Sequence, residues 1–154
     1  MNWYIKVLKN SYDFSGRARR KEYWMFTLTN TLFNFLVTGV LVSTNASFVV
    51  NIVAIIYYVL MFIPILSVSI RRLHDIGKNG WWLLISVLPF IWFLPLFLLP
   101  VAQVFGINMQ YQLVGLVGIF VSLLTIICFI VMITFFCIDS QNGGNQYGAN
   151  PKGE

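Results

Sequence analysis

The sequence has little charge. Only 10% of its 154 residues are Asp, Glu, Lys or Arg, whereas a soluble globular domain carries about 25%. Hydrophobic residues make up 58% of the chain, which is more apolar surface than the core of one domain of this size can use. A lipid solvent accounts for this balance, so we expect a membrane protein rather than a soluble one.

Cysteine, histidine and acidic residues are also scarce. The two cysteines, Cys128 and Cys137, lie in one apolar run and form neither a disulfide framework nor a metal-ligand spacing. One histidine and five acidic residues are too few for a metal-assisted hydrolase, and no serine or cysteine stands in a recognisable nucleophile motif. We therefore expect no metal, no cofactor and no catalytic residue.

Long apolar runs dominate what is present. Four are long enough to cross a bilayer, which takes about 20 residues; they lie at about 23–43, 48–70, 81–105 and 113–138. None contains Asp, Glu, Lys, Arg or His, the residues that usually couple transport to protons or ions. Because backbone groups in lipid must be satisfied within helices, the sequence predicts an all-α fold. Its four transmembrane helices would form a compact bundle, one domain over 1–154.

The basic residues show which side each connection faces. All ten Lys and Arg precede the first run, separate the second from the third, or follow the fourth, while 43–47 and 106–112 carry no charge. The positive-inside rule makes the basic segments cytoplasmic. Both termini are then expected inside, with 139–154 as a cytoplasmic tail.

An amphipathic helix is expected at 2–12. Trp3 lies on its apolar arc, while Lys6 and Lys9 lie on the opposite arc. Such a helix suits the membrane interface, and the alternative is packing against the cytoplasmic end of the bundle. The tryptophans nearest the predicted membrane surfaces are expected to act as interfacial anchors; they are Trp3, Trp24, Trp81 and Trp82.

The polar residues and the prolines inside the predicted spans each allow two interpretations. Residues at three- and four-residue spacing on the first run share one helix face; they are Thr27, Asn30, Thr31, Asn34 and Thr38. Such a stripe either bonds neighbouring helices together or lines a polar pathway. Likewise, Pro89, Pro95 and Pro100 either bend the third run for packing or mark a transport site. We favour packing in both cases.

Three polar motifs flank the runs. They read FSGRARRKEYW at 14–24, RRLHDIGKNGWW at 71–82 and GGNQYGANP at 143–151. Together they resemble the motifs of the YhaH/YhaI-like bacterial inner-membrane family, domain of unknown function 805, over essentially the whole chain. The resemblance implies a four-span bacterial plasma-membrane protein and supplies no activity. Asn79 is a mild departure, since Ser is as frequent there in the family.

The loop at 71–82 is explained largely by its local structure. A helix is expected to continue through His74 and to end in a left-handed cap at Gly77. Glu22 gains nothing from anionic lipid, so we expect it to pair with Arg71 or Arg72. Asp75 is expected to accept hydrogen bonds from Arg17, Arg20 or the loop backbone. The tail is either a disordered terminus or a folded turn around Tyr147 that packs onto this loop, and its turn residues allow the second.

The leading hypothesis is a non-enzymatic platform on the cytoplasmic face. It would bind anionic lipid, a protein partner or a second copy of the chain; nucleic acid is excluded because no basic stripe is interleaved with stacking aromatics. The expected network consists of Arg17, Arg20, Glu22, Arg71, Arg72, His74, Asp75, Asn145 and Tyr147. The alternatives are a channel or uncoupled small-solute transporter and a membrane-embedded enzyme that modifies lipid.

Overall fold

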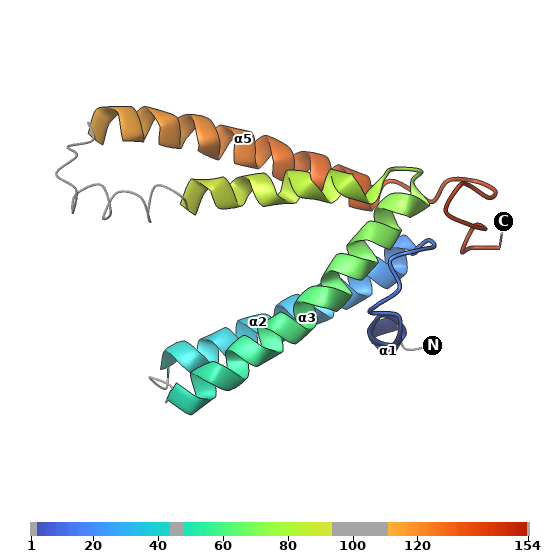
Figure 1. Ribbon diagram of the computed structural model, residues 1–154, viewed down its shortest axis with the longest axis horizontal. Coiled ribbons are helices and arrows are strands. Elements are labelled where there is room, and N and C mark those ends of the chain that lie inside the picture. The colour runs from blue at the N-terminus through green and yellow to red at the C-terminus, as the bar shows by residue number, and fades with distance from the viewer. Residues whose placement is uncertain (1–2, 44–47, 94–110, 154) are drawn as a thin grey trace. The chain divides into compact units, whose positions relative to one another are not determined.

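The computed structural model describes residues 3–43, 48–93 and 111–153 (Figure 1). Regular structure within these ranges is helical, apart from one isolated antiparallel bridge between Asn145 and Gly148. The elements are α1 (Trp3–Lys9), α2 (Arg20–Ser43), α3 (Phe48–Asp75), the 3-10 helix η1 (Gly80–Phe93) and α5 (Tyr111–Cys137).

Three helices among the described residues, α2, α3 and α5, are long and apolar enough to cross a membrane. Large hydrophobic side chains project from them, including Phe35, Phe62 and Phe129, each more than half exposed. Exposure on this scale fits helices that face lipid rather than water. The all-helical membrane fold is therefore confirmed. The count of four spans stays a prediction, because 94–110 lies outside the described residues.

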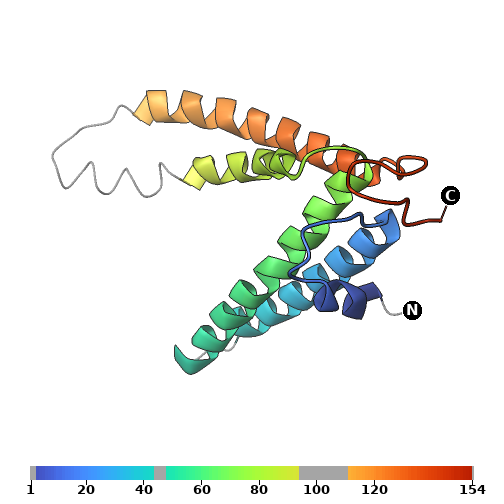
Figure 2. The same cartoon turned by 45° about the vertical axis from the view of Figure 1, so that its right-hand side comes forward.

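The chain divides into two compact parts, and the first comprises Met1–Gly80 with Ile138–Glu154. In this part α2 and α3 run antiparallel, side by side (Figures 1 and 2). The Tyr57 hydroxyl of α3 donates to Asn30 Oδ1 of α2 at 3.1 Å, and the Thr38 and Tyr58 hydroxyls share a hydrogen bond of 3.0 Å. Two members of the polar stripe therefore bond these helices together, which is the packing interpretation.

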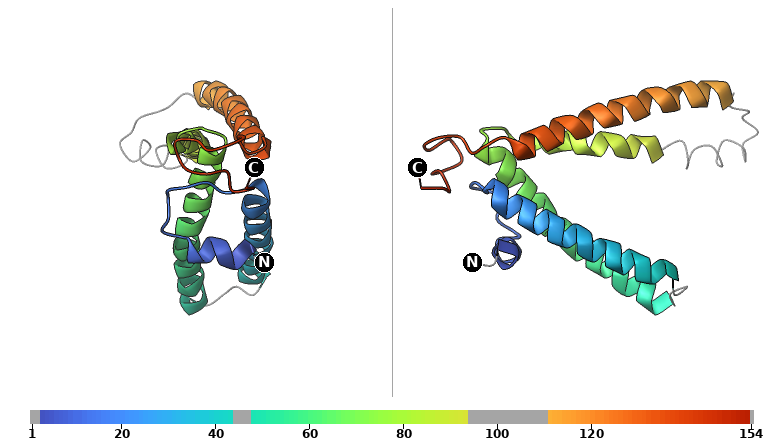
Figure 3. Two further views of the ribbon diagram at one scale, coloured as in Figure 1. Left: turned by 90° about the vertical axis from the view of Figure 1, so that its right-hand side faces the viewer. Right: turned by 180° about the vertical axis from the view of Figure 1, so that it is seen from behind.

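The second part, Trp81–Cys137, contains α5 and all of η1 except its first residue, and the two helices run side by side (Figures 1 and 3). The rings of Trp82 and Phe135 meet edge to face, with centroids 5.4 Å apart. The 14 residues of η1 have 3-10 rather than α geometry, a form that is uncommon over such a length. Pro89 lies within it; proline lacks the N–H that an α-helix uses and clashes with the carbonyl four residues earlier. Pro95 and Pro100 lie outside the described residues.

Helix α1 lies across the beginning of α2 and contacts α3 as well (Figure 3). Its Val7 is fully buried, and Tyr4 stacks on Phe26 of α2 with ring centroids 5.0 Å apart. The segment after α1 is tied down by Ser67 of α3, whose hydroxyl donates to the carbonyls of Asn10 and Asp13 at 3.1 and 2.6 Å. Helix α1 therefore packs against α2 and α3, and it ends at Lys9, three residues earlier than expected. Its place at the membrane interface stays a prediction.

Helix α3 extends beyond its apolar run to Asp75 and ends in a left-handed cap. Gly77 has φ of 73°, its N–H donates to His74 O at 3.0 Å, and the Lys78 N–H donates to Leu73 O at 2.9 Å. This pair of bonds is the Schellman motif, which satisfies the last carbonyls of a helix. The cap turns the chain sharply, so the polar end of α3 is held against neighbouring segments.

Candidate functional site at the charged end

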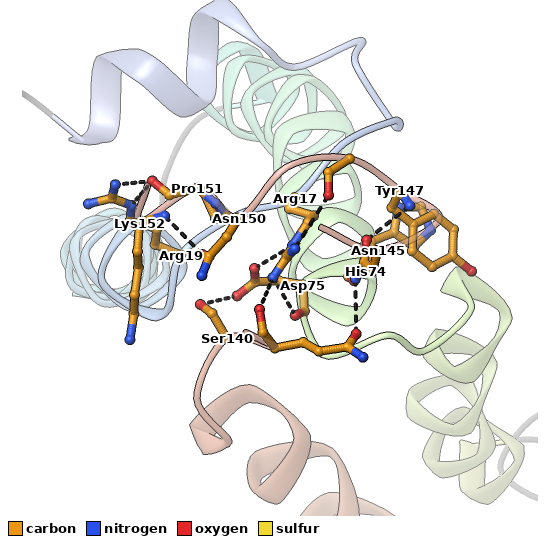
Figure 4. A network of polar contacts seen from close by, with 12 residues as sticks. Arg17, Arg19, His74, Asp75, Ser140, Asn145, Tyr147, Asn150, Pro151 and Lys152 are labelled. Atoms are coloured by element: carbon orange, nitrogen blue, oxygen red, sulfur yellow. Dashed lines mark hydrogen bonds and ion pairs between the residues drawn. The ribbon is translucent and has the colours of Figure 1, made fainter. Parts of the chain in front are cut away.

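The polar residues of the first part gather at one end, here called the charged end. It consists of residues 14–24 around the start of α2, residues 71–80 around the end of α3, and the tail 138–153. Figure 4 shows side chains from all three segments converging there. The three motifs of the sequence are therefore brought together, although the first and third lie more than 100 positions apart.

Asp75 is the centre of the network (Figure 4). Its carboxylate is fully buried and accepts hydrogen bonds from Arg17 Nε at 3.0 Å, Arg72 Nη1 at 2.6 Å and Ser140 Oγ at 2.5 Å. Each motif or its flank supplies one of these donors. Burying a carboxylate is costly unless it is paired and hydrogen-bonded, and here both oxygens are occupied.

The arginines around Asp75 also bind the tail through its backbone. Arg17 Nη1 donates to Gly143 O at 2.8 Å and its Nη2 to Gln141 O at 2.6 Å, while Arg72 Nη2 donates to Ile138 O. The planar guanidinium presents five donors in a fixed fork, so one arginine can hold a carboxylate and two carbonyls at once. The tail is consequently held by buried arginines, a role that lysine could not fill.

Glu22 is a second buried carboxylate. It accepts Lys6 Nζ at 2.5 Å and Arg71 Nη1 at 3.5 Å. The pair with Arg71 was expected from the sequence, whereas Lys6 was not, because its spacing placed it on the polar face of α1. Among the residues that the structure describes, Nε and Nη2 of the buried Arg71 find no hydrogen-bond partner.

His74 and Tyr147 join the tail to the end of α3. Their rings stack with centroids 3.8 Å apart and an interplanar angle of 1°. Asn145 Nδ2 donates to His74 O at 2.9 Å, and the Asn145 side chain also accepts the Tyr147 N–H at 2.9 Å. His74 Nδ1 lies 3.3 Å from Gly16 O, so in that contact it is the donor. The tail therefore folds into a turn against the loop, as the spacing of its turn residues suggested.

The rim of the charged end carries exposed ion pairs. Asp139 accepts Lys152 Nζ at 2.8 Å and Arg20 Nη2 at 3.3 Å. The hydrogen bond from Lys152 is the main reason why the pKa of the Asp139 carboxyl is lowered. Arg20 was a candidate partner for Asp75. In the structure Arg20 pairs with Asp139 instead, and Arg17 pairs with Asp75.

The tryptophans expected as membrane anchors fall in both parts. Trp3 and Trp24 are half-buried in the first part, and the Trp24 ring meets Tyr23 at 5.4 Å. Trp81 and Trp82 begin η1 in the second part and are both exposed. Their role as interfacial anchors stays a prediction.

Several residues of the site carried no signal in the sequence. Arg19, Asp139, Ser140 and Pro151 either flank a run or lie in a tail without periodicity, and neither position predicts a partner. Among the described residues, no hydrogen bond joins the side chains of His74 and Asp75, and no group of three or more His, Cys, Asp or Glu could hold a metal ion. The site is a buried network of ion pairs and hydrogen bonds that links the three segments.

These observations define a helical membrane protein in which buried ion pairs join three segments of the chain at the charged end. The family model described as "Protein of unknown function (DUF805)" matches residues 11–149, and the chain belongs to this family. The motif resemblance is thereby confirmed.

Two curated relatives from Escherichia coli (strain K12) are inner-membrane proteins. Inner membrane protein YhaI is 33% identical over 152 residues, which cover 99% of this chain and 97% of the relative. Inner membrane protein YhaH is 48% identical over 94 residues, 59% of this chain and 77% of the relative. No solved structure matches the chain. The chain therefore belongs to a family described as of unknown function, its relatives are inner-membrane proteins, and its own helices are long and apolar enough to span a membrane.

Proposed function

We propose that the protein is a non-enzymatic platform that binds anionic lipid at the cytoplasmic surface of the inner membrane. The observation that carries this proposal is that buried cations are paired with buried carboxylates, while other cations lie exposed at the rim. The carboxylates of Asp75 and Glu22 hold the buried cations in place. The more exposed cations Arg20, Lys21 and Lys152 remain at the rim. Basic residues near an anionic membrane surface contribute about 1 kcal/mol each to binding.

The proposal includes a four-span topology with both termini inside. All ten basic residues fall on alternate connections, and both described ends of the chain lie at the charged end (Figure 1). The described residues of the third run support it too. A 3-10 helix rises about 2.0 Å per residue, so the 14 residues of η1 extend about 28 Å, close to the thickness of a hydrocarbon core.

The buried network would make the platform rigid rather than carry out chemistry. Both oxygens of Asp75 are occupied, so this carboxylate is not available as a base. Its partners fix the tail, and the tail carries Lys152. A tail that is already ordered favours binding, because the entropy of immobilising its side chains is lost on folding and not on binding.

Asp75→Ala in the purified full-length protein tests the proposal, with Asp13→Ala as the control. Both variants lose one carboxylate, but the Asp13 carboxylate is exposed, and its hydrogen bonds to described residues are local ones from Ser15. Native mass spectrometry should show less retained phosphatidylglycerol for Asp75→Ala and unchanged retention for Asp13→Ala.

Unchanged lipid retention together with unchanged stability in Asp75→Ala would contradict the platform. The same spectra report the mass of the assembly. A dimer or larger assembly that dissociates in Asp75→Ala without loss of lipid would instead assign the charged end to contact between copies of the chain.

A further inference from the structure

A cavity lies at the rim of the charged end, apart from the network around Asp75. Its volume is about 410 Å³, and sites for small molecules measure about 300–1,000 Å³. It is lined by Trp3, Arg19, Arg20, Lys21 and Lys152. These residues come from α1, from the start of α2 and from the tail, so the cavity exists only in the folded protein. Four of its five lining residues are cations.

Positive charge is concentrated in this cavity. Arg19 donates through Nε and Nη2 to the Pro151 carbonyl (Figure 4), which is an uncharged acceptor. Arg20 and Lys152 share the carboxylate of Asp139. Lys21 forms no ion pair with any residue that the structure describes. The carboxylate that Arg20 and Lys152 share is itself half exposed.

The fold itself holds these like charges together. Asn150 is buried, its Oδ1 accepts the Lys152 N–H at 3.0 Å, and the neighbouring Pro151 is held by Arg19. Lys152 is thereby placed next to residues of α2 that are more than 130 positions away in sequence. Self-repulsion among clustered charges destabilises a folded protein, and a bound anion would relieve that repulsion.

We propose that this cavity binds a phosphate group presented by an anionic lipid headgroup. Arginine and lysine are the usual partners of phosphate oxygens, and the Trp3 ring can lie against the apolar part of the headgroup region. The cavity opens where α2 begins, and α2 is long and apolar enough to span the membrane, so its ligand would be at the bilayer surface. This proposal rests on the platform function and names its ligand site.

The test uses the purified full-length protein in a neutral detergent, with phosphatidylglycerol titrated against phosphatidylcholine. Thermal unfolding should shift upward and saturate with phosphatidylglycerol. Lys21→Glu and Lys152→Glu are each expected to weaken the apparent affinity at least fivefold. Lys9→Glu is the matched control, because Lys9 is also exposed and lies on α1 but does not line the cavity; it should retain the affinity of the wild type.

Two results would overturn the cavity as a specific site. One is an equal loss of affinity in Lys9→Glu, which would indicate diffuse attraction to charge. The other is unchanged affinity in Lys21→Glu; this variant should fold normally, because Lys21 has no ion pair to lose among the described residues, and its unfolding temperature without lipid checks that.

A further titration distinguishes the sources of phosphate. Potassium phosphate is compared with potassium chloride at equal ionic strength. Saturable stabilisation by inorganic phosphate, with no further shift from phosphatidylglycerol, would overturn the lipid assignment; a shift with the lipid alone supports it.

The platform and the cavity can fail separately. Wild-type lipid affinity in Lys21→Glu together with lost retention in Asp75→Ala would reject the cavity and keep the platform. Wild-type behaviour in both variants would reject both.

Discussion

The charged end and the apolar helices differ in which side chains they bury and which they expose. At the charged end the fully buried side chains include Glu22, Arg72 and Asp75, whereas along α2 and α3 large apolar side chains such as Phe35 and Phe48 are nearly four-fifths exposed. A soluble protein shows the reverse distribution. The difference indicates that one chain is adapted to two solvents, with water at the charged end and lipid around the helices.

The two regions are also held together differently. At the charged end, buried carboxylates, guanidinium groups and backbone carbonyls form directional bonds between segments distant in sequence. Along their apolar lengths, α2 and α3 are joined by the hydrogen bonds Tyr57–Asn30 and Thr38–Tyr58 and by the aromatic contact of Phe33 with Tyr57. Single substitutions should therefore have their largest effects where a buried charge loses its partner.

The largest expected effect comes from Asp75→Ala, which breaks the charged end at its centre. It leaves Arg17 and Arg72 buried without their carboxylate, and removing one partner of a buried ion pair costs about 3–5 kcal/mol. The free energy of unfolding in detergent measures the loss. Asp139→Ala removes an exposed carboxylate and should leave that free energy close to the wild-type value; equal losses in the two variants would show that burial is not the cause.

Phe62→Arg introduces a charge into the apolar region instead. Phe62 is exposed near the middle of α3, where an arginine in lipid costs about 2.5–3.5 kcal/mol on insertion scales. The fraction of protein inserted in the membrane should fall, and Phe62→Leu should insert normally. Normal insertion of the arginine variant would mean that this face of α3 is not in contact with lipid.

Glu22→Gln tests the second buried carboxylate. The amide keeps the size of the side chain but no longer neutralises Lys6 and Arg71. We expect a loss of about 1–3 kcal/mol in unfolding free energy, less than for Asp75→Ala, because Lys6 is partly exposed and can reach water. A loss as large as that of Asp75→Ala would contradict this ranking of the two carboxylates.

Gly77→Ala, compared with Gly16→Ala, tests whether the tail contacts the loop in addition to the backbone strain that both substitutions cause. The residue has φ of 73°, where an L side chain costs about 1–2 kcal/mol, and an added Cβ would lie 2.7 Å from Gln141 Oε1. Gly16→Ala is the control, with φ of 78° and no atom within 4 Å of the added Cβ. Gly77→Ala should lower the unfolding temperature more than Gly16→Ala, and the reverse order would argue against the tail lying over the loop.

The smallest expected effect concerns the stack of Tyr147 on His74. Tyr147→Ala should cost about 0.5–1.5 kcal/mol, the value of an aromatic pair beyond its buried area. Tyr147→Phe keeps the ring and should be nearly neutral. Faster hydrogen exchange in the tail of the alanine variant would locate the loss, while exchange rates equal to those of the wild type would show that the stack does not hold the tail.

Part of the site could be predicted residue by residue. Glu22 and Asp75 were recognisable because an acid among basic residues at a membrane surface needs a cation, and the structure supplies Arg71 and Arg17. Gly77 was recognisable as a helix cap from its place after His74. The pairing of Lys6 with Glu22, and the part played by Ser140, could not be foreseen, because each depends on where α1 or the tail packs.

The helix type of the third apolar run could not be predicted from the sequence either. Its apolar character predicted a helix, but periodicity and composition do not distinguish 3-10 from α geometry around Pro89. That choice depends on backbone bonds that the pattern of side chains does not report.

The order of the residues is enough to predict a helical membrane protein, the positions of its apolar runs and the gathering of its charges in three segments. Apolar length and the cost of placing charge in lipid are local properties, so they can be read directly from the order of residues. The packing of the fold sets which cation meets which carboxylate, how the tail is held, and that Lys152 shares a cavity with Arg19, Arg20 and Lys21. Ion pairing depends on distances of a few ångströms between distant segments, and only packing sets those distances.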